Sequence, residues 1–296
     1  MARNRIVVSL SAMAVAGGLV AGLPASAAVA ASPAVTPICA SEWNPAKAYA
    51  GGLVASYGGR NWRAKWWNQN NVPGGSSGNW TDKGACEANE GNFVVTEAQF
   101  EEMFKERNPF YTYSGLVTAL SAYPEFAATG SDTVKKQEAA AFLANISHET
   151  GGLRHIVEVN TANYSHYCEP AKPYGCPAGL SSYYGRGPIQ LSWNFNYKAA
   201  GDALEIDLLN NPDLVQKEAS VAWMTAIWYW MTQNGPGTMT PHAAMVGGHG
   251  FGETIRSING RLECDGANSR QVENRVRLYL EFTGILGVDP GSGLRC

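Results

Sequence analysis

The chain lacks an excess of basic residues. Its 296 residues include 22 lysines and arginines against 25 aspartates and glutamates, a net charge of −3. The first 31 residues contain Arg3 and Arg5 and no acidic residue, so the rest of the chain carries 20 basic and 25 acidic residues, a net charge of −5. Domains that bind nucleic acids are usually strongly basic. The composition therefore argues against a nucleic-acid partner, and it gives no support to a polyphosphate substrate.

Several motifs that bind metals or activate a nucleophile are also missing. No Cys-x-x-Cys or Cys–His pair has the spacing of zinc ligands, and no histidine follows His148-Glu149 at the spacing of a zinc protease. Ser192 is not part of a G-x-S-x-G motif, and Gly248–Gly252 lacks the preceding strand of a nucleotide-binding loop. His242 and His249 stand alone in expected loops, where a structural or exposed role is favoured. We therefore expect no metal and no cofactor.

Only one apolar run suggests a membrane or targeting segment, and it lies at the N-terminus. Arg3 and Arg5 precede the apolar run 6–23, and the small residues Pro24-Ala25-Ser26-Ala27 follow it. A basic start, an apolar centre and a small-residue cleavage site are typical of a secretory signal. A membrane anchor is the alternative, but the run is short and no stop-transfer charges follow it. We predict that residues 1–31 are a signal peptide and that the protein is extracellular, with no membrane partner.

Six cysteines in a secreted chain predict disulfide bonds. Three bridges can be drawn among them in fifteen ways. Proximity in the sequence favours the pairs Cys39–Cys86, Cys168–Cys176 and Cys264–Cys296. The first pair would enclose a small module, residues 39–86, which follows a short mature segment, residues 32–38.

The module 39–86 is rich in aromatic residues for its size. These are Trp43, Tyr49, Tyr57, Trp62, Trp66, Trp67 and Trp80. Short strands are predicted at 53–57 and 61–67, joined by a turn at Gly58-Gly59. So small a unit cannot bury every ring, and a bulge or strand end would expose both Trp66 and Trp67. Exposed indoles form flat platforms on which sugar rings stack; the alternative is that the pair belongs to the core.

The run from Tyr57 to Gln69, followed by Pro73-Gly74, resembles the small chitin-binding modules of bacterial chitinases. Its Ala64–Trp67 sequence is specific to that group. The resemblance implies a compact, all-β carbohydrate-binding module that binds insoluble chitin through exposed aromatic rings. The candidate rings are Tyr57, Trp66 and Trp67. Residues 87–92 follow as a short polar linker.

The remaining segment, residues 93–296, is long enough for one domain and is mostly helical in pattern. Thr96 and Gln99 form a capping box at the start of one helix. Further helices are predicted at 114–122, 134–147, 215–231, 252–258 and 271–282. The best strand signal is 183–191. The sequence therefore predicts a mainly α domain with a small β element.

One buried helix ends with a residue suited to acid catalysis. Phe142, Leu143 and Ile146 recur at helical spacing, and Gly151-Gly152 should end the helix just after Glu149. The negative end of the helix dipole and the apolar neighbours both disfavour an ionised carboxylate, so we expect a raised pKa for Glu149. A general acid that works near neutral pH needs such a pKa. A solvated or salt-bridged glutamate is the alternative.

Glu158 can face Glu149 only if the chain turns between them. On one straight helix, nine residues would separate the two by a rise of roughly 13.5 Å and half a turn. The glycine pair breaks the helix, so Glu158 can fold back across a cleft. An ordinary surface carboxylate is the alternative.

Segment 183–197 alternates polar residues with apolar or aromatic ones. If it is extended, alternation places its polar side chains on one side. These are Gln190, Ser192, Asn194 and Asn196. Amides and hydroxyls in a row suit a neutral, hydroxyl-rich ligand, whereas a polar edge strand is the alternative.

Four motifs of this domain together resemble family 19 chitinases. They are His148–Gly152, Tyr184–Ser192, Asn194–Tyr197 and Ile258–Gly260, in that family's order and spread over the whole domain. The secreted Streptomyces-type enzymes with a front chitin-binding module are the most similar group. The resemblance implies a mainly α, two-lobed, lysozyme-like fold with a cleft.

The resemblance also implies roles for individual residues. Glu149 matches the general acid, Glu158 the general base of the bacterial members, and Ser192 the residue that helps to hold the attacking water. Arg275, with Glu263 nearby, matches the charged group linked to the acid, and this cation would lower the pKa of Glu149. The expected substrate-binding residues are His148, Gln190, Asn196, Asn259 and Arg275.

The implied function is a secreted, endo-acting chitinase that hydrolyses β-1,4 bonds between N-acetylglucosamine units with inversion. Chitin and its oligosaccharides would be its partners, and we expect a monomer. Two alternatives remain open: a related enzyme that cleaves the glycan of peptidoglycan, and a chitin-binding lectin with an inactive domain. The chain departs from the plant pattern in a shorter segment between the two glutamates and in Met224, where the plant enzymes carry lysine.

Overall fold

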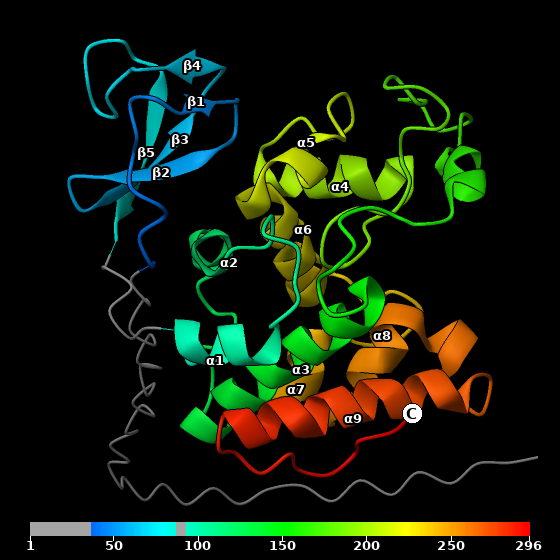
Figure 1. Cartoon of the computed structure of the whole chain (residues 1–296). Helices are drawn as coiled ribbons and strands as arrows, with labels where there is room; N and C mark the ends of the chain where they lie inside the picture. The colour runs from blue at the N-terminus through cyan, green and yellow to red at the C-terminus, as the bar shows by residue number, and fades with distance from the viewer. Residues whose placement is uncertain (1–36, 87–92) are drawn as a thin grey trace, which may run out of the picture. The chain divides into compact units, whose positions relative to one another are not determined.

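The computed structural model describes residues 37–86 and 93–296, which form a small strand-rich module and a larger helical domain (Figure 1). The predicted signal peptide, most of the segment 32–38 and the linker 87–92 lie outside the described residues. Within the described ranges, no helix has both the length and the hydropathy needed to cross a membrane. The predicted fold class, a mainly α domain preceded by a β module, is confirmed.

The module contains two small antiparallel sheets. One pairs β1 (Ala48–Tyr49) with β4 (Asn68–Gln69). The other has the strand order β2 (Val54–Tyr57), β3 (Arg60–Ala64), β5 (Trp80–Ala85). The strands predicted at 53–57 and 61–67 are therefore present, but the second ends before the tryptophan pair.

A tight hairpin and an aromatic pair hold the module together. Gly58 and Gly59 join β2 to β3 with φ angles of 59° and 71°, and two consecutive positive φ angles are what a type I′ turn requires. The rings of Tyr49 and Trp80 are buried and meet edge to face, with centroids 5.0 Å apart. The Cys39–Cys86 disulfide closes the module at its ends.

The large domain is a helical assembly built around two long helices, α3 and α9. Its elements are α1 (Glu97–Met103), α2 (Tyr113–Leu120), α3 (Asp132–Thr150), the 3-10 helix η1 (Thr161–Tyr167), α4 (Asn194–Leu204), α5 (Leu214–Lys217), α6 (Ala219–Thr232), α7 (Pro241–Val246), α8 (Phe251–Glu263) and α9 (Ser269–Ile285). α3 is buried on every side from Glu138 to Ser147, because α9, α7 and α8 all pack against it. Figure 1 shows α9 running alongside it. Burial of this kind holds the end of α3 in a fixed place.

Helix α6 supplies much of the remaining core. Its three tryptophans Trp223, Trp228 and Trp230 are buried, and Trp230 meets Phe142 of α3 edge to face with centroids 5.5 Å apart. The single helix predicted for 215–231 is interrupted at Glu218, whose φ and ψ of −118° and 107° are extended. The structure therefore has a short α5 before α6.

The strand predicted at 183–191 is wrong. In the part of the chain that the structure describes, this segment makes only two isolated bridges, Arg186 with Leu191 and Arg186 with Val157. Gly187 and Gln190 have φ angles of 72° and 51°, so the chain turns back on itself between Arg186 and Leu191. Helix α4 then begins at Asn194. Alternation of polar and aromatic residues predicted an extended segment, but a tight turn and a helix start produce the same pattern here.

Helix α7 was also missed by the sequence pattern, and it moves His242 from an expected loop into a helix. Thr240 caps α7 by accepting a hydrogen bond from the Ala243 N–H, 3.1 Å away. The His242 Nδ1 lies 2.7 Å from the buried Glu138 carboxylate, which also accepts a 2.9 Å bond from the Trp230 indole. The structural role expected for His242 agrees with this contact.

Two further disulfides lie in the helical domain. Cys168 pairs with Cys176, and Cys264 pairs with Cys296, with Cα atoms 6.2 Å and 5.0 Å apart. The second bridge ties the C-terminal segment to the end of α8. All three pairs coincide with those favoured by sequence proximity.

Candidate active site

Glu149 lies in the last turn of α3, where the sequence placed it. Gly151 caps the helix in the left-handed region, with φ 62° and ψ 41°. The N–H groups of Gly151 and Gly152 both donate to the carbonyl of Ser147, as expected for a helix stopped by glycine. The predicted helix end is therefore confirmed, and the Glu149 side chain is about one-fifth exposed at that end.

A buried cation holds the Glu149 carboxylate. The Arg275 guanidinium on α9 is 1% exposed and donates to Glu149 through Nη2. The same guanidinium donates to both carboxylate oxygens of Glu263, at 2.8 Å and 2.7 Å, and to Asn145 Oδ1 at 3.1 Å. Arg275 thus connects three helices at one point, α3, α8 and α9.

Glu263 acts as a permanent counterion in this cluster. Its side chain is fully buried, and Asn259 donates a 2.7 Å bond to its Oε1. Burial opposes ionisation, but the hydrogen bonds and charge of Arg275 hold the pKa of Glu263 below its usual value. Because one cation serves two carboxylates, Glu149 does not face an unopposed positive charge.

Glu149 lines a cavity of about 440 Å³ together with side chains from distant parts of the chain. The predicted residues Gln190, Ser192, Asn196 and Asn259 all lie on its wall. Tyr167, Trp193, Tyr229, Ile258 and Leu262 supply larger surfaces that the sequence analysis did not assign to the site. A signal for Trp193 was available, because it lies between two of the family motifs, whereas nothing near Tyr229 or Leu262 marked them.

The wall that carries Ser192 has a strained backbone. Gln190 and Trp193 have positive φ angles of 51° and 77°, and such conformations in non-glycine residues persist where the surrounding structure enforces them. Trp193 stacks on Phe195 with centroids 5.5 Å apart, and Ser192 Oγ donates to the Gln190 carbonyl at 2.9 Å. Asn194 does not join this wall, because its amide donates to the carbonyls of Glu169 and Gly175 instead.

Glu158 is held beside the cavity by neutral donors. Its Oε1 accepts from Asn163 Nδ2 at 2.8 Å and from the Tyr167 hydroxyl at 3.0 Å. Its Oε2 is buried and has no hydrogen-bond partner among the described residues. Glu158 is not itself among the residues that line the cavity, but its partner Tyr167 lines it together with Glu149.

Gly185 brings Glu158 and Ser192 close to one another. The Glu158 N–H donates to the Gly185 carbonyl at 2.8 Å. A methyl group placed on Gly185 would lie 2.9 Å from Gln190 Oε1 and 3.3 Å from Ser192 Oγ. Gly185 therefore contacts both the backbone of Glu158 and the side chain of Ser192.

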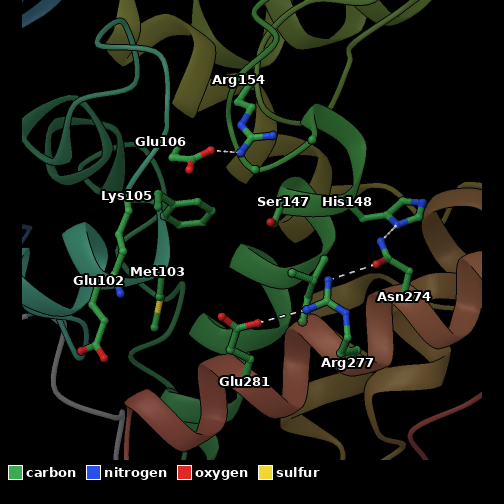
Figure 2. Close-up of a pocket in the computed structure, with 14 residues that line it drawn as sticks. Glu102, Met103, Lys105, Glu106, Ser147, His148, Arg154, Asn274, Arg277 and Glu281 are labelled. Atoms are coloured by element: carbon green, nitrogen blue, oxygen red, sulfur yellow. Dashed lines mark hydrogen bonds and ion pairs between the residues drawn. The ribbon is translucent and has the colours of Figure 1, made fainter.

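His148 is not among the residues that line this cavity. It lines a separate groove of about 450 Å³ with residues of α1 and α9. Its ring is hydrogen-bonded to Asn274 (Figure 2). His148 therefore lines a different hollow from the other expected substrate-binding residues Gln190, Asn196 and Asn259.

The tryptophan pair of the module is exposed. Trp66 and Trp67 are 55% and 65% exposed, and Tyr57 is 43% exposed. Both tryptophans follow the end of β3, so strand alternation does not force one of them inward. The alternative that this pair forms the module core is wrong, because Tyr49 and Trp80 occupy that place.

A helical domain with carboxylates at a polar cleft, preceded by a module with exposed indoles, defines a carbohydrate-cleaving enzyme with its own binding module. Comparison with protein families agrees. Residues 94–296 match the glycoside hydrolase family 19 profile, described as chitinase class I. Residues 42–81 match carbohydrate-binding module family 5/12. The chain belongs to the family 19 chitinases, and it carries a chitin-binding module of family 5/12.

Individual relatives are similar over much of this chain. Chitinase C of Streptomyces griseus HUT6037 is 64% identical in a structural match that covers 87% of this chain and 100% of that one, with a TM-score of 0.69. Chitinase 6 of Oryza sativa subsp. japonica is 46% identical over 187 residues, 63% of this chain and 66% of that protein. Endochitinase EP3 of Arabidopsis thaliana is 44% identical over 209 residues, which are 69% of this chain and 73% of that protein. Family membership favours chitin hydrolysis over the two alternatives left open by the sequence.

Proposed function

We propose that this enzyme cuts β-1,4 bonds inside chitin chains by a single displacement that inverts the anomeric centre. Glu149 protonates the leaving oxygen, Glu158 removes a proton from the attacking water, and Ser192 helps to hold that water. The observation that supports this assignment best is the bridge through Gly185. The Glu158 backbone and the Ser192 hydroxyl both approach Gly185, and Ser192 and Glu149 line the same cavity, which supports joint action of these three residues.

The charge cluster behind Glu149 suits an acid that must lose and regain a proton in each turnover. Glu263 is held by two hydrogen bonds from Arg275 and so balances its charge. Ionised Glu149 is also attracted to Arg275 and keeps its hydrogen bond to that residue. When Glu149 is protonated, Arg275 and Glu263 remain as a buried, charge-balanced ion pair.

A retaining mechanism needs a carboxylate nucleophile about 5–5.5 Å from the acid, whereas inversion leaves room for a water at roughly 6.5–9.5 Å. The carboxylate linked most directly to Glu149 is Glu263, but it is fully buried, is held through both oxygens and does not line the cavity. Glu158 has its own partners and shares none with Glu149 among the described contacts. The burial and pairing of Glu263 argue against its acting as a nucleophile, which supports attack by a water.

The stereochemistry of the first product tests the mechanism. Proton NMR of a chitin oligosaccharide digest, recorded before mutarotation, should show the α-anomer at the newly formed reducing end. An initial β-anomer would overturn both the inverting mechanism and the role of Glu158.

The remaining polar groups of the cavity suit a neutral sugar chain. Gln190, Asn196 and Asn259 offer amides from three different elements, and no basic residue lines the same wall. Trp193 and Leu262 add apolar surface for ring faces and acetyl methyl groups. We assign the three amides to sugar binding or water positioning.

The module is proposed to bind chitin through Trp66 and Trp67, with Tyr57 beside them. Replacing both tryptophans by alanine should weaken adsorption to insoluble chitin while leaving cleavage of short soluble oligomers near normal. Aromatic contacts are worth about 1 kcal/mol each beyond buried area, so two lost platforms correspond to a roughly 30-fold weaker adsorption. Val72→Ala is the matched control, since Val72 is an exposed apolar residue of the same module without a ring. Equal loss on soluble and insoluble substrates would contradict this assignment.

Secretion is part of the same proposal. Three disulfides in one chain suit an oxidising compartment. We assign residues 1–31 to a signal peptide, 39–86 to the chitin-binding module, 87–92 to a linker and 93–296 to the catalytic domain. N-terminal sequencing of the secreted protein tests the first boundary.

A further inference from the structure

A second groove lies next to the catalytic acid but outside the cleft. It is lined by the end of α3, by α1 and by α9, and it contains His148, the residue before Glu149 (Figure 2). Its wall carries both signs of charge. The charged residues are Glu102, Lys105, Glu106, Arg154, Arg277 and Glu281. The groove therefore has no net preference for an anion or a cation, and the ordered bonds within it are more informative than its charge.

A chain of hydrogen bonds runs along α9 to the His148 ring. Glu281 accepts from Arg277 Nη1 at 3.2 Å, and Arg277 Nη2 donates to Asn274 Oδ1 at 3.1 Å. Asn274 Nδ2 then lies 2.8 Å from His148 Nδ1. Figure 2 shows these side chains pointing toward one another in sequence.

The direction of the last bond follows from the first two. Arg277 can only donate, so the atom of Asn274 that faces it must be the carbonyl oxygen. The amide NH₂ of Asn274 then faces His148 and can only donate, so His148 Nδ1 must accept. A ring nitrogen that accepts carries no proton. His148 is therefore neutral, with its single proton on Nε2.

Two adjacent residues of α9 bind two adjacent residues of α3. Asn274 and Arg275 are adjacent on α9, and they bind the adjacent residues His148 and Glu149 on α3. Burial and the charge of Arg275 lower the pKa of His148, while Glu149 and Glu263 act in the opposite direction. The geometry and the surrounding charges thus favour the same neutral ring.

We propose that Asn274 is a positioning residue that keeps His148 neutral and so keeps a second cation away from the general acid Glu149. This inference rests on the proposed function, because it takes Glu149 as the acid. Arg275 already supplies one positive charge, which Glu263 balances. A protonated His148 would add an unbalanced charge and favour the ionised form of Glu149, which cannot donate a proton.

The protonation state of His148 can be measured without reference to activity. In protein labelled with ¹⁵N-histidine, the His148 ring is assigned by the signals lost in His148→Gln, or in His148→Asn if that variant folds better. Long-range ¹H–¹⁵N spectra from pH 8 to pH 5 should show the Nε2–H form throughout. In Asn274→Ala the ring should titrate about 0.7 pH unit higher, the equivalent of one lost hydrogen bond, and in Asn274→Asp higher still.

The effect of a charge at position 148 on catalysis is tested by placing a permanent cation there. His148→Lys should move the alkaline limb of the kcat/KM profile about one pH unit lower, because a nearby cation favours ionised Glu149. His148→Gln, which is neutral, should leave that limb in place. Thermal melts of both variants identify a loss that is due only to misfolding.

Two results would overturn the inference. One is a wild-type His148 that carries its proton on Nδ1 or titrates near its ordinary pKa, and the other is an unmoved alkaline limb in a folded His148→Lys enzyme. The first result is independent of the mechanism, whereas the second requires that Glu149 is the acid that sets the alkaline limb. Failure of the proposed function would show instead as activity retained in Glu149→Gln.

Discussion

Glu149 and Glu158 are held by opposite kinds of partner. Glu149 sits at the end of a buried helix and shares the Arg275 guanidinium with Glu263, so its environment is set by full charges on three helices. Glu158 sits in an irregular segment after that helix, and its side chain receives hydrogen bonds only from an amide and a phenol. Both of these neutral donors lie on the 3-10 helix η1.

This difference suits the two chemical roles proposed for these residues. An acid must be stable both with and without its proton, and a cation already balanced by Glu263 permits this for Glu149. A base must be ionised and must keep one oxygen free for the incoming proton. Glu158 has two donors on Oε1 and none on the buried Oε2. Charged partners thus surround the proposed acid, and neutral partners leave one oxygen of the proposed base without a hydrogen bond among the described residues.

Removing the acid should have the largest effect. Glu149→Gln should reduce kcat by about 10³-fold, within the usual contribution of general acid catalysis, because an amide cannot protonate the leaving oxygen. The fold should survive, since Arg275 keeps its two bonds to Glu263. Initial rates on a chitin oligosaccharide, with a thermal melt alongside, measure both effects. A folded variant with near wild-type turnover would show that another group is the acid.

Removing the base should have the next largest effect. Glu158→Gln should lower kcat by about 10²-fold, because the amide oxygen can still accept from Tyr167 and Asn163 but cannot take a proton. Ser192→Ala provides a graded comparison and should lower kcat only about tenfold, roughly the effect of losing one positioning hydrogen bond. Both are read from single-substrate kinetics. If Glu158→Gln retained the wild-type rate, the base would have to be sought among other carboxylates.

The acid side of this comparison could be largely predicted from the sequence. Apolar spacing before Glu149 and the glycines after it are local signals, and they gave the correct helix and its end. The Arg275 contact crosses from α3 to α9, between residues that are 126 positions apart. Only the family resemblance pointed to it, because spacing along the chain carries no information about such a contact.

The base side was predicted less well, because its geometry depends on turns. Positive φ angles at Gln190 and Trp193 arise from tertiary contacts and have no glycine to signal them in the sequence. Alternating residues therefore suggested a strand where the structure has a turn followed by α4. Tyr167 was not predicted as a site residue, because its contact with Glu158 depends on a 3-10 helix that no periodic pattern in the sequence predicts.

The smallest predicted effect separates the neutral partners of Glu158 from one another. Burial and the bond to Glu158 raise the pKa of Tyr167 to about 12, so its hydroxyl remains a donor across the working range. Tyr167→Phe removes that donor from Oε1 and makes the ionised carboxylate less favourable. The group must be ionised to act as a base, so the acid limb of kcat/KM should move to higher pH by up to about one unit, while the alkaline limb, set by Glu149, stays in place.

Tyr164→Phe is the matched control for this shift. The Tyr164 hydroxyl also donates to Glu158, but to the backbone carbonyl at 3.0 Å rather than to the carboxylate. Its ring stacks on Tyr184 with centroids 3.6 Å apart, and phenylalanine preserves that contact. The acid limb should therefore remain where it is in Tyr164→Phe. If both variants moved the limb equally, the shift would come from displacement of the segment, and the Tyr167 hydroxyl would have no specific influence on the charge of the base.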